Sequence, residues 1–140
     1  MEKIRILLID DEPSFTRMLK LNLERTGAFK VLCENTGAFG LTAARDFLPD
    51  MVFLDVIMPD VDGGEVAAQI HADPKLKDTP IVFLTAGVSK ESTRAKPVIG
   101  GRTFLAKPVS VDEVLRCIER QLGKKVAAGR SAVGASAAGA

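Results

Sequence analysis

The stretch from residue 51 to residue 60, MVFLDVIMPD, places an acid inside an apolar run. Four apolar residues precede Asp55 and three follow it. Taking an isolated ionised carboxylate out of water costs several kcal/mol unless the group is paired or binds a metal. Asp55 is therefore a candidate for a chemical site, and other parts of the sequence should supply its partners.

Three further apolar runs also end in residues that could do chemistry. These are Asp10, Asp11 and Glu12 after the run 4–9, Thr85 after 81–84, and Lys107 after 103–106. Carboxylate oxygens are ligands for hard cations, whereas hydroxyl and ammonium groups can contact an anion. If the fold brings these residues to Asp55, they form an acidic pocket that also holds a hydroxyl and an ammonium.

The elements that position these residues begin with five short apolar runs. The runs are β-branched, aromatic or leucine-rich and mostly continuous, which is typical of strands covered on both faces of a sheet. They are IRILLI (4–9), KVLC (30–33), MVFL (51–54), IVFL (81–84) and TFLA (103–106).

Helical patterns lie between the predicted strands. Pro13 is a favourable first-turn residue, and Gly27 suits the end of the same helix. Ser110 and Glu113 have the spacing of a capping box at the start of the last helix. The stripes expected to face the core are Phe15, Met18, Leu19 and Leu23; Phe39, Ala43, Ala44 and Phe47; Val66, Ala67 and Ile70; and Val114, Ile118 and Leu122.

The alternation of strands and helices predicts the fold class α/β, with a doubly wound, five-stranded parallel sheet covered by helices on both faces. In such a sheet all carboxyl ends of the strands lie along one edge, where ligands bind. The predicted site residues, which all follow strands, should therefore meet at this edge.

The charge of this cluster indicates which ligands it can take. Asp10, Asp11 and Asp55 cannot all stay ionised so close together unless a cation joins them, and Mg²⁺ suits a cluster of carboxylate oxygens. Mg²⁺ and Lys107 would balance the three charges and let the pocket accept a dianionic phosphoryl group. Lys107 and Thr85 would contact its oxygens while Asp55, already deprotonated at pH 7, attacks as a nucleophile.

Four stretches carry a specific resemblance to a known family: LLIDDEP, FLDVIMPDVDGGE, PIVFLTA and FLAKP, in this order. Their residues and spacing resemble the receiver domain of bacterial response regulators in two-component signalling, similar in plan to the chemotaxis regulator. The resemblance covers about residues 3 to 123. It implies a flavodoxin-like (βα)5 three-layer sandwich.

The resemblance implies roles for the acidic residues. Asp55 would be the phosphoacceptor. Asp11 would bind Mg²⁺ directly, Asp10 would bind it mostly through water, and Ile57 would supply a backbone carbonyl to the same ion.

The resemblance also implies a switch. Thr85 would be the switch hydroxyl, Lys107 would contact the phosphoryl group, and Phe104 falls where the family carries its switch aromatic. The peptide bond between Lys107 and Pro108 is expected to be cis, which is nearly confined to bonds that precede proline.

The implied function is acceptance of a phosphoryl group from a sensor histidine kinase or a histidine phosphotransfer protein. Phosphorylated Asp55 would then switch an interaction surface for an unknown effector protein, and a homodimer is left open. Such a domain is not an enzyme acting on an external substrate. We expect a cytoplasmic protein, since no apolar run approaches the ~20 residues needed to span a bilayer. The net charge of +1 includes three bases in residues 124–140; the other 123 residues hold 16 bases against 18 acids, which gives no electrostatic case for nucleic acid.

Two other functions fit parts of the sequence. A receiver-like scaffold or dimerisation module that never cycles phosphate would explain the irregular segment 88–102, but it would leave the complete acidic set unexplained. An aspartyl phosphatase would need a second acid two residues after Asp55, where Ile57 stands.

The remaining expectations concern the segments around this site. The segment 88–102 contains Pro97 and two adjacent glycines, which predict a short or irregular helix near 89–95 followed by a loop. The domain is expected to span residues 1–123, and the Ala-, Gly- and Ser-rich residues 124–140 to be a flexible tail or linker. Cys33 and Cys117 have no metal-binding spacing and are expected to be free thiols.

Overall fold

A computed structural model describes residues 2–86, 98–99 and 102–123. Its sheet contains the five predicted parallel strands, each within one residue of the expected bounds. In spatial order they are β2 (Phe29–Glu34), β1 (Ile4–Ile9), β3 (Met51–Asp55), β4 (Ile81–Thr85) and β6 (Arg102–Ala106). The predicted α/β fold with a parallel sheet is therefore confirmed.

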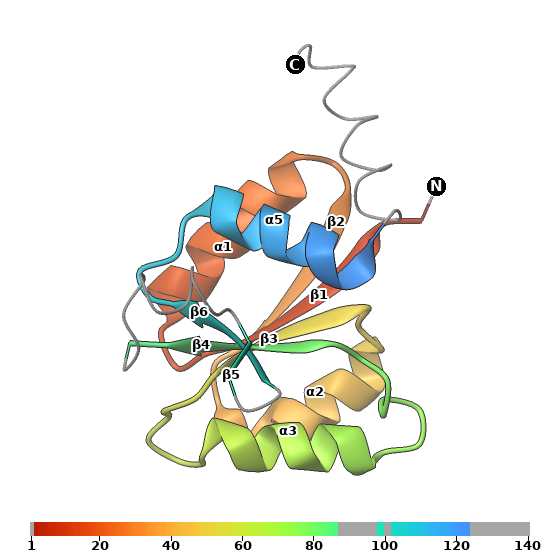
Figure 1. The fold of residues 1–140 in the computed structure, drawn as a ribbon, viewed down its shortest axis with the longest axis vertical. Helices are drawn as coiled ribbons and strands as arrows, with labels where there is room; N and C mark the ends of the chain where they lie inside the picture. The colour runs from red at the N-terminus through yellow and green to blue at the C-terminus, as the bar shows by residue number, and fades with distance from the viewer. Residues whose placement is uncertain (1, 87–97, 100–101, 124–140) are drawn as a thin grey trace.

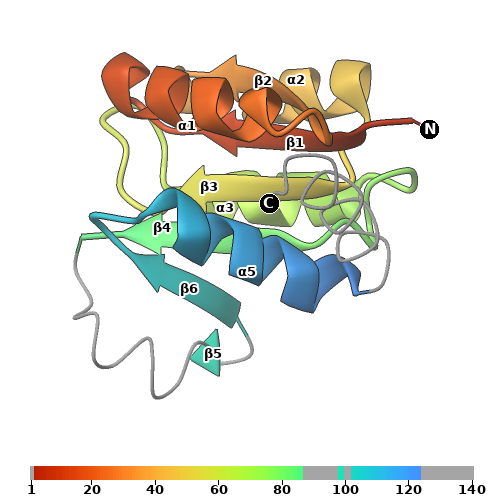
Figure 2. The same ribbon diagram turned by 90° about the horizontal axis from the view of Figure 1, so that it is seen from above.

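Among the described residues, two helices cover each face of the sheet, as Figures 1 and 2 show. One face carries α1 (Pro13–Arg25) and α5 (Val111–Leu122), and the other carries α2 (Gly40–Phe47) and α3 (Gly63–Ala72). A separate apolar core lies under each pair, because successive residues of a strand point to opposite faces. The central strands β1, β3 and β4 are buried on both sides along nearly their whole length, which explains the continuous apolar runs in the sequence.

The helix ends follow from local sequence. Pro13 starts α1, and Gly27 has a φ of 84° just after its end, a conformation that glycine adopts without strain. Ser110 and Glu113 form the predicted capping box of α5, with reciprocal hydrogen bonds of 3.0 and 3.1 Å. These signals fix where each helix begins, and so fix the loops at the carboxyl edge of the sheet.

Two residues of the predicted apolar stripes are exposed, and these two predictions were wrong. Phe39 belongs to the 3-10 turn η1 (Gly37–Phe39) before α2 and is 58% exposed, because the 3.6-residue period of α2 does not extend into this turn. Met18 is also exposed on α1. Thr16 is buried instead, since its hydroxyl donates to the Pro13 carbonyl and accepts from the Asn35 amide.

The segment 88–102 differs from the prediction where the structure describes it. A two-residue strand, β5 (Val98–Ile99), pairs antiparallel with β6, which begins at Arg102 within the stretch predicted to be a loop. Val98 and Ile99 are β-branched residues that favour strands. The helix predicted near 89–95 and the predicted tail 124–140 lie outside the described residues.

Within the part of the chain that the structure describes, none of the helices has the length and apolar character needed to cross a membrane. Cys33 and Cys117 are both free thiols, as predicted.

Candidate functional site

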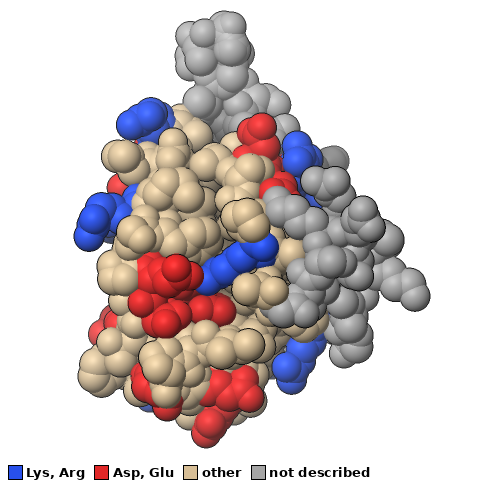
Figure 3. All heavy atoms as spheres, turned by 90° about the vertical axis from the view of Figure 1, so that its left-hand side faces the viewer, with Lys and Arg blue, Asp and Glu red and all other residues tan. Residues whose placement is uncertain are grey.

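The candidate site lies along the carboxyl edge of the sheet, where β1, β3, β4 and β6 end. Figure 3 looks onto this edge and shows acidic atoms gathered beside basic atoms at the centre of the face. Parallel pairing sets this arrangement: Asp55 is level with Leu84 on β4, and Thr85 is level with Ala106 on β6. Residues far apart in the sequence therefore share one edge, as the strand ends predicted.

The acidic part of the site consists of Asp10, Asp11 and Asp55. One carboxylate oxygen from each lies within 4.8 Å of the others. Asp10 is completely buried and Asp55 is only 6% exposed, so the two carboxylates have little water to stabilise their charge. The three residues thus form one compact group at the end of β1 and β3.

Lys107 reaches into this acidic group from the end of β6. Its Nζ lies 2.7 Å from Asp10 Oδ2, 3.0 Å from Glu12 Oε1 and 3.5 Å from Asp55 Oδ2. The ring of Phe15 on α1 lies beside the ammonium, with its centroid 4.9 Å from Nζ. Lys107 therefore points toward Asp55, but its two closest acidic partners are Asp10 and Glu12.

Backbone hydrogen bonds hold the ends of these strands together. The Lys107 N–H donates to the Thr85 carbonyl at 2.9 Å, and the Val56 N–H donates to the Leu84 carbonyl at 3.0 Å. The peptide bond between Lys107 and Pro108 is cis, as the resemblance led us to expect. Lys107 is thereby tied by its main chain to the strand that carries Thr85.

The pKa values reflect the crowding of acids. Burial, followed by the negative charge of Asp10, raises the pKa of Asp55 to about 6, against the opposing effect of the Lys107 ammonium. Burial also raises the pKa of Asp10. Burial acts to lower the pKa of Lys107, but its ion pairs with Asp10 and Glu12 outweigh this and hold the pKa above its usual value. Lys107 is thus charged, while Asp55 resists ionisation without a further cation.

The acidic group fits a divalent cation. Octahedral Mg²⁺ has ligands about 2.1 Å away, so neighbouring ligands lie about 3.0 Å apart and opposite ones about 4.2 Å apart. One oxygen from each of the three acids lies within 4.8 Å of the other two, which is near enough to reach a shared ion after small side-chain adjustments. Asp10 Oδ2 is buried and accepts no aligned hydrogen bond from the described residues, although the Lys107 ammonium lies beside it. Hard oxygen donors with unmet charge are what Mg²⁺ binds best.

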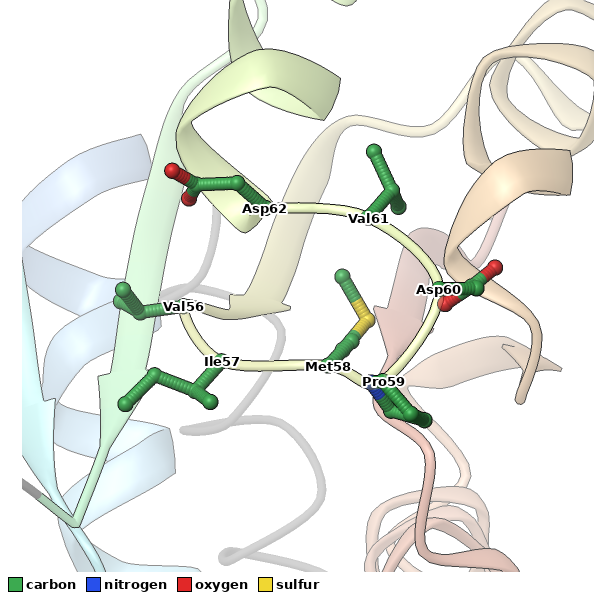
Figure 4. A pocket seen from close by; sticks show the side chains of 7 residues that line it. All are labelled: Val56, Ile57, Met58, Pro59, Asp60, Val61 and Asp62. Carbon is green, nitrogen blue, oxygen red and sulfur yellow. The ribbon is translucent and has the colours of Figure 1, made fainter.

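The loop between β3 and α3 borders the acceptor strand (Figure 4). Residues 56–62 line an open pocket of ≈ 430 Å³. Met58 points into the ring of the loop, whereas Ile57 points away from it and is 71% exposed. The Ile57 N–H donates to Asp55 Oδ1 at 3.3 Å. The predicted role of the Ile57 carbonyl as a metal ligand stays a prediction.

Gly63 allows this loop to close against the acceptor residue. A Cβ at this position would overlap the backbone carbonyl of Asp55, so only glycine permits the approach. Asp62 caps α3 by accepting from the Gly64 N–H at 2.8 Å. The PDVDGG stretch therefore fixes the backbone on one side of Asp55.

Thr85 and Phe104 lie on the same face of the sheet. Phe104 is level with Phe83 on β4, two residues before Thr85, and the Phe83 and Phe104 rings stack with centroids 5.5 Å apart. Thr85 is buried, and Phe104 is partly buried against the core under α2 and α3. Their predicted switching roles stay predictions.

Three residues around the site had no assigned role in the sequence analysis. Glu12 pairs with Lys107, and Phe15 lies against the same ammonium. The Asn35 amide donates to the Asp10 carbonyl at 2.7 Å, which ties the turn after β2 to the turn after β1. Glu12 and Asn35 are polar residues that lie just after β1 and β2, so the pattern of polar residues at strand ends could have found both.

Comparison with known proteins defines the class to which this fold and site belong. The sequence model of the response regulator receiver domain matches residues 6–119, so the chain belongs to the receiver-domain family of two-component response regulators. The cluster of Asp10, Asp11 and Asp55, of which Asp10 and Asp55 are buried, fits the phosphoacceptor pocket of that family.

Individual relatives agree with this assignment. The chain is 30% identical to PilH of Pseudomonas aeruginosa, over 84% of this chain and 97% of PilH. It is 33% identical to the DNA-binding dual master transcriptional regulator RpaA of Synechocystis, over 79% of this chain and 46% of RpaA. The chain thus spans about half the length of RpaA and of other regulators it matches.

Solved structures show the same fold. The receiver domain of the sensor histidine kinase PA1611 of Pseudomonas aeruginosa has a TM-score of 0.73 at 26% identity, covering 88% of this chain and 100% of that one. It was solved with a magnesium ion coordinated in the active site cleft. The Vibrio cholerae chemotaxis protein CheY4 has a TM-score of 0.72 at 27% identity, covering 85% and 98%.

Proposed function

We propose that this domain accepts a phosphoryl group on Asp55 in a Mg²⁺-dependent reaction and so switches a protein-interaction surface. The observation that carries the proposal is the position of the Lys107 ammonium, 3.5 Å from Asp55 Oδ2 inside a buried acidic group. A buried carboxylate beside a fixed ammonium can receive a dianionic group that neither residue could hold alone.

The donor is a phosphohistidine of a sensor histidine kinase or of a histidine phosphotransfer protein. A carboxylate oxygen of Asp55 attacks phosphorus in line, the phosphorus–nitrogen bond breaks, and its electron pair returns to the imidazole, which then takes a proton. No base of this chain is required, because the attacking oxygen carries no proton in the ionised form. The ammonium of Lys107 stabilises the negative oxygens of the transferring group.

Asp10, Asp11 and Asp55 would hold the Mg²⁺ ion. When bound, the ion lowers the pKa of these acids and neutralises charge on the phosphoryl oxygens. The chain itself keeps Asp10 in place through two groups, the Glu12 N–H at 2.9 Å from Oδ1 and the Lys107 ammonium at 2.7 Å from Oδ2.

The switch follows from the strand that carries Thr85. A phosphoryl group on Asp55 would draw the Thr85 hydroxyl toward it, and Phe104 would move in response on the same face of the sheet. The change biases a two-state surface that an effector protein reads. The domain therefore acts as a signalling component and does not turn over an external substrate.

The test is to incubate the protein with acetyl phosphate and Mg²⁺ and to measure its intact mass. We expect an adduct of about 80 Da, the mass of a phosphoryl group, that disappears in Asp55→Asn and when Mg²⁺ is chelated. An adduct that persists in Asp55→Asn would reject Asp55 as the acceptor. The absence of any adduct in the wild type would favour the scaffold alternative, and rapid release of phosphate from an added ester would favour the phosphatase.

A further inference from the structure

We propose that Glu12 is a positioning residue that binds Lys107 in the resting domain and must release it when a phosphoryl group arrives. Glu12 would thus slow phosphorylation by competing for the ammonium that the phosphoryl group needs. The inference rests on the proposed function of Asp55 as the acceptor. It assigns a regulatory role to a residue outside the predicted acceptor, metal and switch residues.

The distances at Lys107 show the competition. Its Nζ is closer to Glu12 Oε1, at 3.0 Å, than to Asp55 Oδ2, at 3.5 Å. The Lys107–Glu12 contact is an aligned hydrogen bond. An ammonium has three N–H donors, and its two closest acids, Asp10 and Glu12, leave at most one donor for an acceptor on Asp55.

Exposure indicates which acidic partner can leave. The Glu12 side chain is 60% exposed, whereas that of Asp10 is completely buried. Glu12 can turn into water at little cost, but Asp10 would remain as a buried charge without its partner. When the Lys107 ammonium exchanges one acidic partner for a phosphoryl group, Glu12 should therefore be the partner that leaves.

The charge of the site gives a reason for the exchange. Mg²⁺ and Lys107 would balance the three aspartates alone, but the carboxylate of Glu12 also contacts the same ammonium. Four carboxylates, one ammonium and one divalent ion leave one uncompensated negative charge before any phosphoryl group binds. Moving Glu12 away from Lys107 removes this excess at the place where the phosphoryl oxygens must lie.

Phe15 restricts movement of the Lys107 side chain away from the acidic group. Its ring lies beside the ammonium, at 4.9 Å from centroid to Nζ, and the Lys107 side chain is only 15% exposed. The ammonium therefore has little freedom to swing into water with Glu12. The exposed glutamate, and not the lysine, is the part that can move.

The experiment measures the rate of phosphorylation by acetyl phosphate at saturating Mg²⁺, from the time course of intact mass. Glu12→Gln should phosphorylate about three- to tenfold faster than the wild type, because it removes the competing charge. Glu12→Asp keeps the charge but is one methylene too short to reach Lys107, so it should be nearly as fast as Glu12→Gln. Thermal unfolding checks that each variant is folded.

Glu34→Gln is the matched control for charge alone. Glu34 ends β2 at the same edge of the sheet, and its carboxylate accepts from the Thr36 N–H at 3.0 Å. This variant removes the same charge and keeps a hydrogen-bond acceptor, so its rate should stay close to that of the wild type. Titration of the rate with Mg²⁺ should give a similar half-saturating concentration for the wild type and Glu12→Gln.

The outcomes separate this inference from the proposed function. A wild type that forms no adduct would reject the proposed function. A wild type that forms the adduct at the same rate as Glu12→Gln would reject only the role of Glu12. The role is also rejected if Glu12→Asp behaves like the wild type, if Glu34→Gln accelerates the reaction equally, or if Glu12→Gln weakens the response to Mg²⁺.

Discussion

Acids at the two edges of the sheet have pKa values that are shifted in opposite directions. At the carboxyl edge, burial raises the pKa values of Asp10 and Asp55, so these residues are costly to ionise. At the other edge, where α2 and α3 end, the ion pair with Arg45 at 2.8 Å lowers the pKa of Asp73. Asp50 at that edge accepts from the Arg5 N–H.

The difference separates acids that carry function from acids that stabilise the fold. Both carboxylate oxygens of Asp73 have a partner, because Oδ2 pairs with Arg45 and Oδ1 accepts from the Lys75 N–H at 2.9 Å. At the carboxyl edge three carboxylates, those of Asp10, Glu12 and Asp55, share the Lys107 ammonium, and Asp11 lies beside Asp10 and Asp55, so a further cation is needed to balance these acids. Unbalanced charge at the carboxyl edge therefore fits the proposed cation site, whereas the paired charge of Asp73 at the other edge supports the fold.

The largest expected effect on stability is that of replacing Lys107, and it tests the comparison between the two edges. Lys107→Met should lower the free energy of unfolding by about 2–4 kcal/mol at pH 7 without Mg²⁺, because it leaves buried acids without their cation. Less should be lost at pH 5, where Asp55 takes up a proton. The measurement is urea unfolding followed by circular dichroism, since the chain has no Trp or Tyr. Lys75→Met, an exposed lysine at the other edge, is the control and should change little.

An intermediate effect of opposite sign is expected for Asp55→Asn. The folded-state pKa of about 6 lies above the unfolded value of about 3.9, so the folded state binds more protons and wild-type stability falls as the pH rises from about 4 to 6. Without Mg²⁺, Asp55→Asn should be more stable by about 1–2 kcal/mol at pH 7.5, and the gain should shrink at pH 5. Urea unfolding at both pH values measures it. If Asp55→Asn were less stable than the wild type at pH 7.5, ionised Asp55 would not destabilise the folded protein, and this explanation of its raised pKa would be wrong.

The smallest expected effect lies at the opposite edge. Asp73→Asn should lower the urea midpoint slightly at pH 7, because Arg45, the partner of Asp73 in the ion pair, is 59% exposed to water. The folded-state pKa of Asp73 is lowered, so its contribution is present above the unfolded pKa and is lost as the pH falls through the folded value. Added salt should reduce the loss. An increase in stability would show that the two edges do not differ in this way.

The sequence predicted the fold because its signals were local and agreed with one another. The strands were found to within one residue, and the capping box at Ser110 and Glu113 is present. The errors occurred where a distant contact decides burial. Thr16 is buried in place of Met18 because Asn35, nineteen residues away, bonds to its hydroxyl.

The segment near β5 shows another limit. Pro97 and the paired glycines argue against a long helix, but they do not specify that Val98 and Ile99 pair with β6. Pairing between strands depends on which edge is available in the folded sheet. The sequence of the segment itself does not indicate which strand Val98 and Ile99 will pair with.

The sequence alone determined that acids, a hydroxyl and an ammonium follow strands of one parallel sheet. It could do so because each apolar run and the polar residues that end it are neighbours in the sequence. Only the tertiary structure decided how the single ammonium is shared. Lys107 and Glu12 are 95 residues apart, and their 3.0 Å contact exists because β1 and β6 end at the same edge. Coulomb energy depends on the distance between charges in space, which the order of residues does not state.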